Sequence, residues 1–191
     1  PEFLRQRLAA REGDIVEIPA DSPVYRVREE ALAAAPDEAA RRAIRAQPYV
    51  YAPSDGKVIG RHHGAHFFTV GQRKGLDVGG RPEPLFVIAT DTQANILYVG
   101  QGKSHPGLYR RALWVPARDE HWVREDLRPP LGEGMRVLSR IRYRQPLEQA
   151  TLWRTEQGVC LDFDRPQSAV TAGQFATAYL GEELFFSGPI A

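Results

Sequence analysis

Three arginines and a tyrosine lie close together in the C-terminal half of the chain. Arg140, Arg142 and Arg144 occupy alternate positions, and Tyr143 lies between the last two. If this stretch is a β-strand, the arginines share one face and Tyr143 points to the other. Guanidinium groups on one face attract phosphate, Tyr143 would stack on a base, and Gln145 would read a base edge. A charged outer strand face with Tyr143 in the core fits the same pattern, so the residues leave both interpretations open.

A second basic group lies between two glycines. Gly71 and Gly75 frame Gln72, Arg73 and Lys74. Glycine allows a close approach of the backbone, and cationic side chains beside exposed amides suit an anion such as phosphate. The spacing differs from that of a P-loop, and no serine or threonine follows the lysine. A tight, solvated basic turn is therefore an equally good interpretation.

Histidines and the single cysteine are weaker candidates for chemistry. His62, His63 and His66 lack the helical spacing of zinc proteases, and adjacent histidines on a strand point to opposite faces. A histidine metalloenzyme is a third hypothesis, but we assign no metal ligand. Cys160 lies in an alternating strand with no nearby histidine or lysine to activate it, which indicates a structural cysteine. We assign no catalytic residue in this chain.

The elements that position these residues are short. Residues 2–10 have helical spacing, residues 14–18 alternate weakly, and residues 28–35 and 37–47 form two helical pieces. The helical pieces belong to an expected surface insertion at about 19–54, with solvated arginines. The expected strands cover residues 67–70, 84–90, 95–99, 112–116, 134–141, 149–155, 158–163, 174–180 and 183–186. The fold class is therefore mainly β with some α, with a small α/β central domain at 1–105 and a six-stranded antiparallel β-barrel at 106–191.

Composition excludes several classes of protein. The chain has 191 residues, 42% hydrophobic and 26% charged, which is ordinary for a globular protein and unlike fibrous or disordered chains. Its apolar runs are too short to span a membrane. One cysteine excludes an intrachain disulfide and fits the cytoplasm. The net charge of +1 does not indicate a nucleic-acid binder, so that role must rest on local groups of arginines.

Several short motifs follow one another in a fixed order outside residues 19–54. They are residues 64–76 with Gly79-Gly80, residues 95–102 with His105-Pro106, residues 142–145, residues 163–166, residues 169–171 and Gly173-Gln174. Together they resemble the bacterial tRNA-specific 2-thiouridylases, over residues 1–18 and 55–191.

The resemblance implies an activity that this chain serves only in part. Members of the family have an N-terminal domain that uses ATP with Mg, a small central domain and a C-terminal barrel similar to a translation-factor barrel. They adenylate the C2 oxygen of the wobble uridine, and a persulfide cysteine then delivers sulfur. The implied partners are tRNA, through its anticodon arm, and a sulfur-relay donor protein. The resemblance also implies a cytoplasmic, monomeric enzyme with no membrane partner.

The family's functional residues can be placed on this sequence one by one. Arg142, Tyr143 and Gln174 match positions that contact tRNA. Weaker candidates are Arg140, Arg144, Gln145, Gln72, Arg73 and Lys74. The family's ATP loop and both catalytic cysteines have no counterpart here, and Cys160 matches neither cysteine. We therefore expect a central and C-terminal fragment that is inactive alone.

The sequence also departs from the family's pattern. Ala172 stands where the family has proline, Asp77-Val78 replaces Gly-Ile, and the ending at residues 187–189 is altered. The segment at 19–54 is not typical of the family. The alternative function is a protein-interaction or scaffolding β-barrel whose arginines bind acidic partners.

Overall fold

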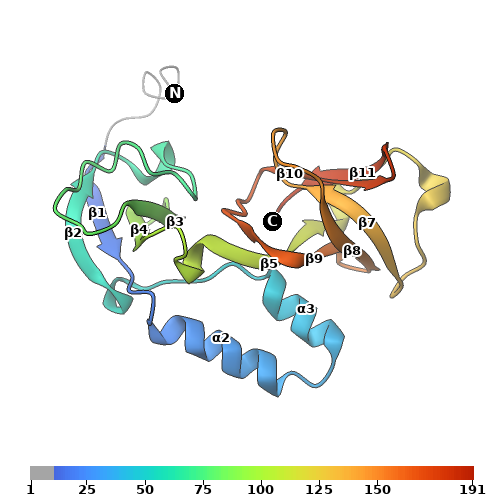
Figure 1. The fold of residues 1–191 in the computed structure, drawn as a ribbon, viewed down its shortest axis with the longest axis horizontal. Coiled ribbons are helices and arrows are strands. Elements are labelled where there is room, and N and C mark those ends of the chain that lie inside the picture. The colour runs from blue at the N-terminus through green and yellow to red at the C-terminus, as the bar shows by residue number, and fades with distance from the viewer. Residues whose placement is uncertain (1–10) are drawn as a thin grey trace. The chain divides into compact units, whose positions relative to one another are not determined.

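The computed structural model describes residues 11–191, which form two compact units (Figure 1). The first unit contains the chain up to Glu30 together with Tyr49–Tyr109, and the second contains Ala31–Pro48 together with Arg110–Ala191. The chain therefore passes from one unit to the other three times. The helix predicted over residues 2–10 lies outside the described residues, and the domain limit expected between residues 105 and 106 stays a prediction.

A four-stranded sheet forms the centre of the first unit (Figure 1). Its strand order is β2 (Lys57–His62), β1 (Gly13–Glu17), β4 (Ile96–Gln101) and β3 (Leu85–Asp91). Strand β1 pairs antiparallel with β2 and parallel with β4, and β3 and β4 form an antiparallel hairpin. In the hairpin turn, the Asp91 carboxylate accepts the amide N–H groups of Gln93 at 2.9 Å and Ala94 at 2.8 Å. The strands expected near residues 14–18, 84–90 and 95–99 are confirmed.

Both faces of this small sheet are buried. Successive residues of a strand point to opposite faces, so Ile15 and Val16 enter different hydrophobic clusters. The cluster of Ile15 includes Leu76, from the glycine-punctuated loop after β2. The cluster of Val16 includes Tyr25, from the first half of helix α2 (Pro23–Ala34), and Tyr51. The loop and the helix are thus both anchored on the sheet by apolar side chains.

The strand predicted over residues 67–70 is wrong. Ala65–Phe67 forms a short 3-10 helix, η2, which a turn follows. The N–H of Ala65 donates to Oδ1 of Asn95 at 3.0 Å, and the N–H of Gly64 donates to Nδ1 of His62 at 2.9 Å. Side chains from other elements hold the start of this segment in a turn, so Phe67 and Phe68 do not join a strand ladder.

Two buried histidines of the first unit share one hydrogen-bond arrangement. Nε2 of His62 donates to the carbonyl of Asn95 at 3.2 Å, and Nε2 of His105 donates to the carbonyl of Ile18 at 3.0 Å. Each Nδ1 accepts the N–H of the residue two positions later, at 2.9 and 3.3 Å. Only a neutral imidazole with its proton on Nε2 makes both bonds. Burial lowers the pKa of both histidines, which favours this neutral form.

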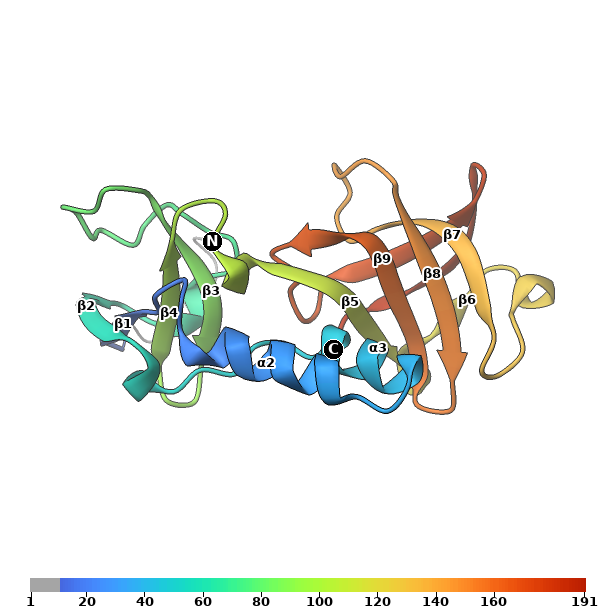
Figure 2. The same ribbon diagram turned by 60° about the horizontal axis from the view of Figure 1, so that its bottom comes forward.

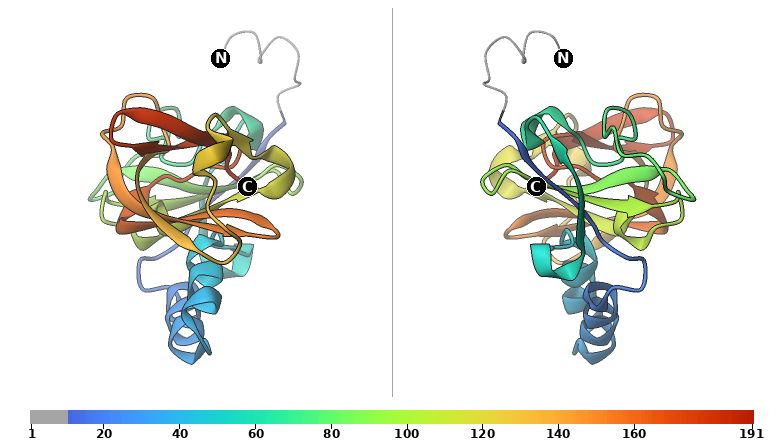
Figure 3. Two further views of the ribbon diagram at one scale, coloured as in Figure 1. Left: turned by 90° about the vertical axis from the view of Figure 1, so that its right-hand side faces the viewer. Right: turned by 90° about the vertical axis from the view of Figure 1, so that its left-hand side faces the viewer.

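A seven-stranded sheet forms the second unit and curls round its own core (Figure 3). In sheet order its strands are β5 (Tyr109–Pro116), β9 (Gly158–Ser168), β8 (Glu148–Thr155), β7 (Gly134–Arg140), β10 (Phe175–Leu180), β11 (Glu183–Pro189) and β6 (His121–Trp122). The pairs from β9 to β6 are antiparallel. The prediction of six strands omitted β6, whose two residues are too few to give a pattern. The N–H of Ala191 donates to the carbonyl of Trp114 at 3.0 Å, which brings the end of the chain back to β5.

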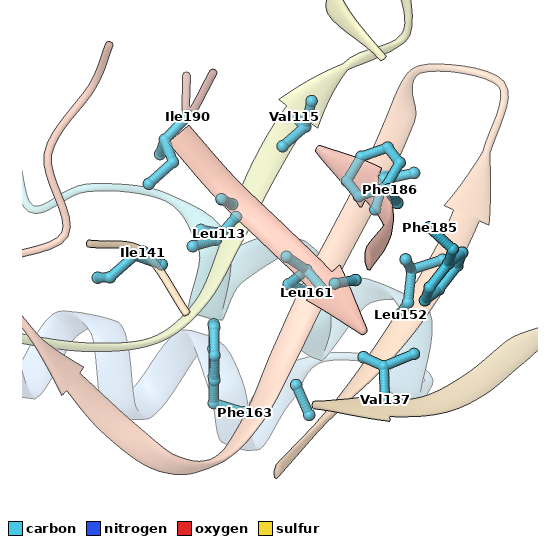
Figure 4. Packing of buried hydrophobic residues seen from close by; sticks show 14 of the residues in the cluster. Leu113, Val115, Val137, Ile141, Leu152, Leu161, Phe163, Phe185, Phe186 and Ile190 are labelled. Atoms are coloured by element: carbon cyan, nitrogen blue, oxygen red, sulfur yellow. The ribbon is translucent and has the colours of Figure 1, made fainter. Parts of the chain in front are cut away.

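The core of the second unit fills the inside of the curled sheet. Figure 4 shows apolar side chains from several strands meeting there, among them Leu152, Leu161, Phe163 and Phe185. These side chains are at most 1% exposed. Since every second residue of a strand enters this core, the residues between them must lie on the outer face of the sheet.

Helix α3 (Glu38–Ala46) packs on the outer face of β8 and β9 (Figure 2). Asp37 caps its start by accepting the N–H of Ala40 at 2.7 Å. A guanidinium nitrogen of Arg45 lies 2.7 Å from a carboxylate oxygen of Asp162, and the guanidinium of Arg42 lies 3.7 Å from the centre of a Trp153 ring. The two expected helices are confirmed, but the expectation that their arginines are solvated is wrong for these two. No helix in residues 11–191 is long and apolar enough to cross a membrane.

Cys160 lies under helix α3. Its side chain packs with Ala46 and Ala112 and is only 1% exposed. Burial raises the pKa of the thiol to about 12, so the thiolate is scarce near neutral pH. These surroundings support the interpretation of Cys160 as a structural cysteine.

Replacing Arg45 should loosen helix α3. We expect Arg45→Ala to lower the free energy of unfolding by about 1–3 kcal/mol, because it leaves the Asp162 carboxylate partly buried without its nearest cation. Unfolding in urea can be followed by tryptophan fluorescence, since Trp114, Trp122 and Trp153 all belong to the second unit. Cys160 should also react faster with a thiol reagent.

The matched control is Arg41→Ala in the same helix. Arg41 is 41% exposed and pairs with the exposed Glu38, so its loss should change the free energy of unfolding by less than about 1 kcal/mol. Equal effects of the two substitutions would contradict the role given to Arg45.

The buried histidines should make the first unit sensitive to acid. Because their folded pKa values lie below the unfolded value, the unfolded chain binds more protons, and stability falls as the pH drops below about 6.5. We expect amide hydrogen exchange in β1 and β4 to reveal this loss. His105→Gln should reduce the pH dependence, whereas replacing the exposed His63 should leave it unchanged. An unaltered pH profile for His105→Gln would refute this assignment.

Candidate nucleic-acid interface

The strand predicted over residues 134–141 is confirmed as β7, which ends at Arg140, so the residues after it do not continue the strand. Ile141 turns into the core with 1% exposure, and residues 142–145 form a turn in which the N–H of Gln145 donates to the carbonyl of Arg142 at 3.1 Å. The Gln145 side chain also accepts the N–H of Ile141 at 3.2 Å. The expectation that Arg140, Arg142 and Arg144 share one strand face is therefore wrong. Arg140 is instead the last residue of β7, and Arg142 and Arg144 lie in the loop between β7 and β8.

Arg142 holds this loop against a second loop, the one between β9 and β10. Its guanidinium donates to the carbonyl oxygen of Ser168 at 2.9 Å and also to that of Ala169. Ala169 has a φ of 52°, a left-handed conformation that disfavours residues other than glycine. Burial lowers the pKa of Arg142, whose positive charge is stabilised by these carbonyls. Arg142 is thus primarily a residue that positions both loops.

Tyr143 projects from the loop into solvent. Its relative exposure is 86%, so the interpretation that places Tyr143 in the core is wrong. The guanidinium of Arg140 lies 5.8 Å from the Tyr143 ring centre and donates to the Tyr143 carbonyl at 3.3 Å. Arg144, the next residue, is also exposed. An exposed aromatic ring on a loop fixed by hydrogen bonds is suited to stacking on a planar ligand.

The positive charge at this end of the sheet is not neutralised. Within residues 11–191, Arg140, Arg142, Arg144 and Arg165 have no carboxylate oxygen within the 4.0 Å of an ion pair, whereas Arg136 pairs with Asp164 at 2.7 Å. The register of β8 against β9 pairs Ala150 with Phe163, and continued by two residues it sets Arg165 opposite Glu148, at the start of β8 where the loop ends. We call these four arginines with Tyr143 the basic end.

Arg165 is the member of the basic end that is absent from the residues predicted to contact RNA. Its carbonyl accepts a hydrogen bond from Nε2 of Gln167 at 2.9 Å, and Gln145 in turn donates to the Gln167 side chain. Gln145 is therefore engaged in fixing the loop rather than turned toward a ligand. The sequence could have indicated Arg165, because this residue lies within the motif at residues 163–166.

Gln174 ends the second loop. Its carbonyl accepts the N–H of Ile190 at 2.8 Å, and its own N–H donates to the carbonyl of Thr171 at 3.3 Å. The side-chain oxygen Oε1 is buried and has no hydrogen-bond partner among the described residues. The structure thus places Gln174 at the end of the loop that Arg142 holds.

The second basic group, between Gly71 and Gly75, belongs to the first unit. Both glycines have a positive φ, 85° for Gly71 and 83° for Gly75, which a residue with a side chain would adopt at these positions only with strain. The Gln72 side chain is engaged within the loop, accepting the N–H of Thr69 at 3.2 Å and donating to the carbonyl of Lys74 at 2.8 Å. Arg73 and Lys74 are exposed. The loop presents these two cations beside a hollow of about 560 Å³ that Arg73 lines.

The histidines do not come together as a metal site. Residues 11–191 contain no group of three or more histidine, cysteine, aspartate or glutamate side chains that could hold a metal ion. His62 is engaged with Asn95, as described above. The geometry thus favours the basic end over the histidines as the candidate site.

Comparison with known proteins identifies relatives along the whole chain. The family described as "tRNA methyl transferase PRC-barrel domain" matches residues 40–101, and that described as "Aminomethyltransferase beta-barrel domain" matches residues 115–190. The tRNA-specific 2-thiouridylase MnmA of Flavobacterium johnsoniae is 51% identical over 191 residues, which are 100% of this chain and 48% of the relative. The protein of the same name from Christiangramia forsetii is 48% identical over 191 residues, with the same coverage.

A more distant relative gives the same picture. The tRNA-specific 2-thiouridylase MnmA of Karelsulcia muelleri is 39% identical over 189 residues, which are 99% of this chain and 46% of the relative. The chain spans about half the length of the curated relatives it matches. Since the first two matches cover the whole chain, they include the helical segment at residues 19–54, which is thus shared with these relatives.

Replacing Arg142 should free both loops at the basic end. In Arg142→Lys the charge remains, but the lysine ammonium is one bond closer to the backbone than Nη2, the nitrogen that donates to both carbonyls. We expect amide hydrogen exchange in residues 141–147 and 168–174 to become about ten-fold faster. Arg144→Lys, on the same loop but at a residue that does not hold the carbonyls of Ser168 and Ala169, is the control and should leave exchange unchanged. Equal exchange rates in the two variants would show that Arg142 does not position the loops.

Proposed function

Because the chain belongs to the tRNA-specific 2-thiouridylase family, we propose that it forms the part of such an enzyme that binds and positions tRNA. The observation that carries this proposal is the basic end. It combines four arginines that have no carboxylate partner among the described residues with an exposed tyrosine ring. Phosphate and unpaired bases are the ligands that such a surface suits best.

The geometry gives the residues of the basic end different tasks. Arg144 and Arg165 are exposed and would contact phosphate groups of the anticodon arm. Tyr143 would stack on an unpaired base, since its ring is 86% exposed. Arg142 acts mainly by positioning the loop, because its guanidinium already holds two carbonyl groups. Gln145 supports the same loop, and Gln174 keeps a buried side-chain oxygen available for a donor.

The chemical steps of the proposed enzyme are assigned to residues outside these 191. The enzyme would use ATP with Mg to adenylate the wobble uridine, and a sulfur-relay donor protein would supply the persulfide sulfur. Cys160 is unsuited to carry that sulfur, because it is buried and its thiol pKa is raised to about 12. A cytoplasmic location and a monomeric state stay predictions.

We include the loop at residues 71–75 as a secondary contact. Arg73 and Lys74 are exposed and would contact the phosphate backbone of the tRNA, whereas Gln72 is engaged inside the loop. Phosphate contacts of this kind contribute affinity but little base specificity.

The basic end can be tested by measuring the affinity for an anticodon-arm RNA at several salt concentrations. Tyr143→Ala should weaken binding by about 1–3 kcal/mol through the loss of a stacked base. Arg144→Gln should weaken binding and reduce the dependence of log K on log salt by about 0.7–0.9, through the loss of one phosphate contact. Fluorescence anisotropy with a labelled RNA would measure both effects.

The control is Arg118→Gln, which removes an arginine that is 85% exposed but pairs with Asp119. Its affinity and salt dependence should match those of the unaltered chain. If Tyr143→Ala and Arg144→Gln also leave RNA binding unchanged, the proposal fails, and the arginines would be better explained as a contact for an acidic protein.

A further inference from the structure

The outer face of β7 and β10 continues the basic end along the sheet. Ala176 and Ala178 of β10 point into the core, so Phe175, Thr177 and Tyr179 point outward. On β7, Val137 is in the core and Ser139 is buried, so Leu138 and Arg140 point outward as well. The register pairs Thr177 with Arg140 and Tyr179 with Leu138. Arg140 therefore lies on the same outer face as the aromatic residues of β10.

Arg140 is fixed between two tyrosine rings. Its guanidinium carbon lies 5.8 Å from the centre of the Tyr143 ring and 5.4 Å from that of Tyr179. It donates to the Tyr179 hydroxyl at 2.9 Å, and Thr177 donates to the Arg140 carbonyl at 3.2 Å. A cation held in this way loses little freedom when it binds an anion.

Phe175 places an exposed aromatic ring on the same face. The residue is 60% exposed, although it lies at the start of a strand rather than in a loop. The outer face of β8 and β9 differs, because α3 covers it and its Asp162 is paired with Arg45. The outer face of β7 and β10 thus combines an exposed aromatic ring with a fixed cation that lacks a carboxylate partner among the described residues. This combination matches an unpaired nucleotide, which offers a base to the ring and a phosphate to the cation.

We infer that Phe175, Tyr179 and Arg140 form a second contact for tRNA, at which an unpaired base stacks on the aromatic residues of β10 while Arg140 holds the neighbouring phosphate. The inference rests on the proposed function and extends the RNA surface from the loop to the outer face of β7 and β10. Tyr179 acts partly as a positioning residue, because its hydroxyl fixes the Arg140 guanidinium.

The test compares two variants of the 191-residue chain on two RNAs. Phe175→Ser should weaken binding of a tRNA anticodon arm at least about five-fold. It should not change binding of a perfectly paired RNA duplex, whose bases cannot stack on the ring. Arg140→Gln should reduce the salt dependence of binding by about one phosphate contact on either RNA. Val123→Ser, which replaces another half-exposed apolar residue of the second unit, is the control for Phe175.

The outcomes separate this inference from the proposed function. If Tyr143→Ala weakens binding but Phe175→Ser does not, the second contact is refuted and the basic end stands. If Phe175→Ser weakens duplex binding equally, base stacking on Phe175 is refuted. If none of the three substitutions changes RNA binding, both the inference and the proposed function fail, which leaves an acidic protein as the partner to test.

Discussion

The alternation of side chains along the strands of the curled sheet determines what its surface can carry. Phe163, Leu152 and Val137 enter the core, so the residues beside them must lie outside, whatever their chemistry. On β8 and β9 these outer residues include Trp153 and Asp162, which helix α3 covers through Arg42 and Arg45. On β7 and β10 they include Arg140 and Tyr179, which remain at the surface. The alternation of side chains along the strands thus creates both the surface on which α3 packs and the proposed RNA surface.

Arginine has two distinct uses in the second unit. Arg45 is partly buried and Arg142 is exposed, but the guanidiniums of both hold protein groups in place, a carboxylate for Arg45 and two carbonyls for Arg142. Arg144 and Arg165 are exposed and pair with no carboxylate among residues 11–191. The first kind stabilises the scaffold, and the second leaves charge available for a ligand. A net charge of +1 for the whole chain does not reveal this separation, because most of the other arginines are neutralised locally.

Local patterns predicted most of the elements, because alternation and capping depend on near neighbours. The cap of Asp37 on Ala40 and the turn at Asp91 are interactions of this kind. The strand predicted over residues 67–70 is wrong because those residues follow a turn that His62 and the distant Asn95 hold. The idea that the arginines up to Arg144 share a strand face fails in a similar way, because the turn at residues 142–145 is tied to Ser168 and Ala169. Asn95, Ser168 and Ala169 are distant in sequence from the turns they hold, so no local pattern shows these contacts. The same limit hid Tyr179, whose value as a site residue comes only from its contact with Arg140.

The chain crosses between its two units three times, and this limits how one unit can be isolated from the other. A single cut after Tyr109 would release a second unit without residues 31–48, and so without helix α3. Asp162 would then lose Arg45, Trp153 would lose Arg42, and the thiol of Cys160 would lose the cover of Ala46. Such a piece would expose an oxidisable thiol beside an apolar surface, which favours covalent dimers and aggregation. The barrel can be isolated in its native form only if the helical segment is joined back to it, for instance by a linker from residue 48 to residue 110.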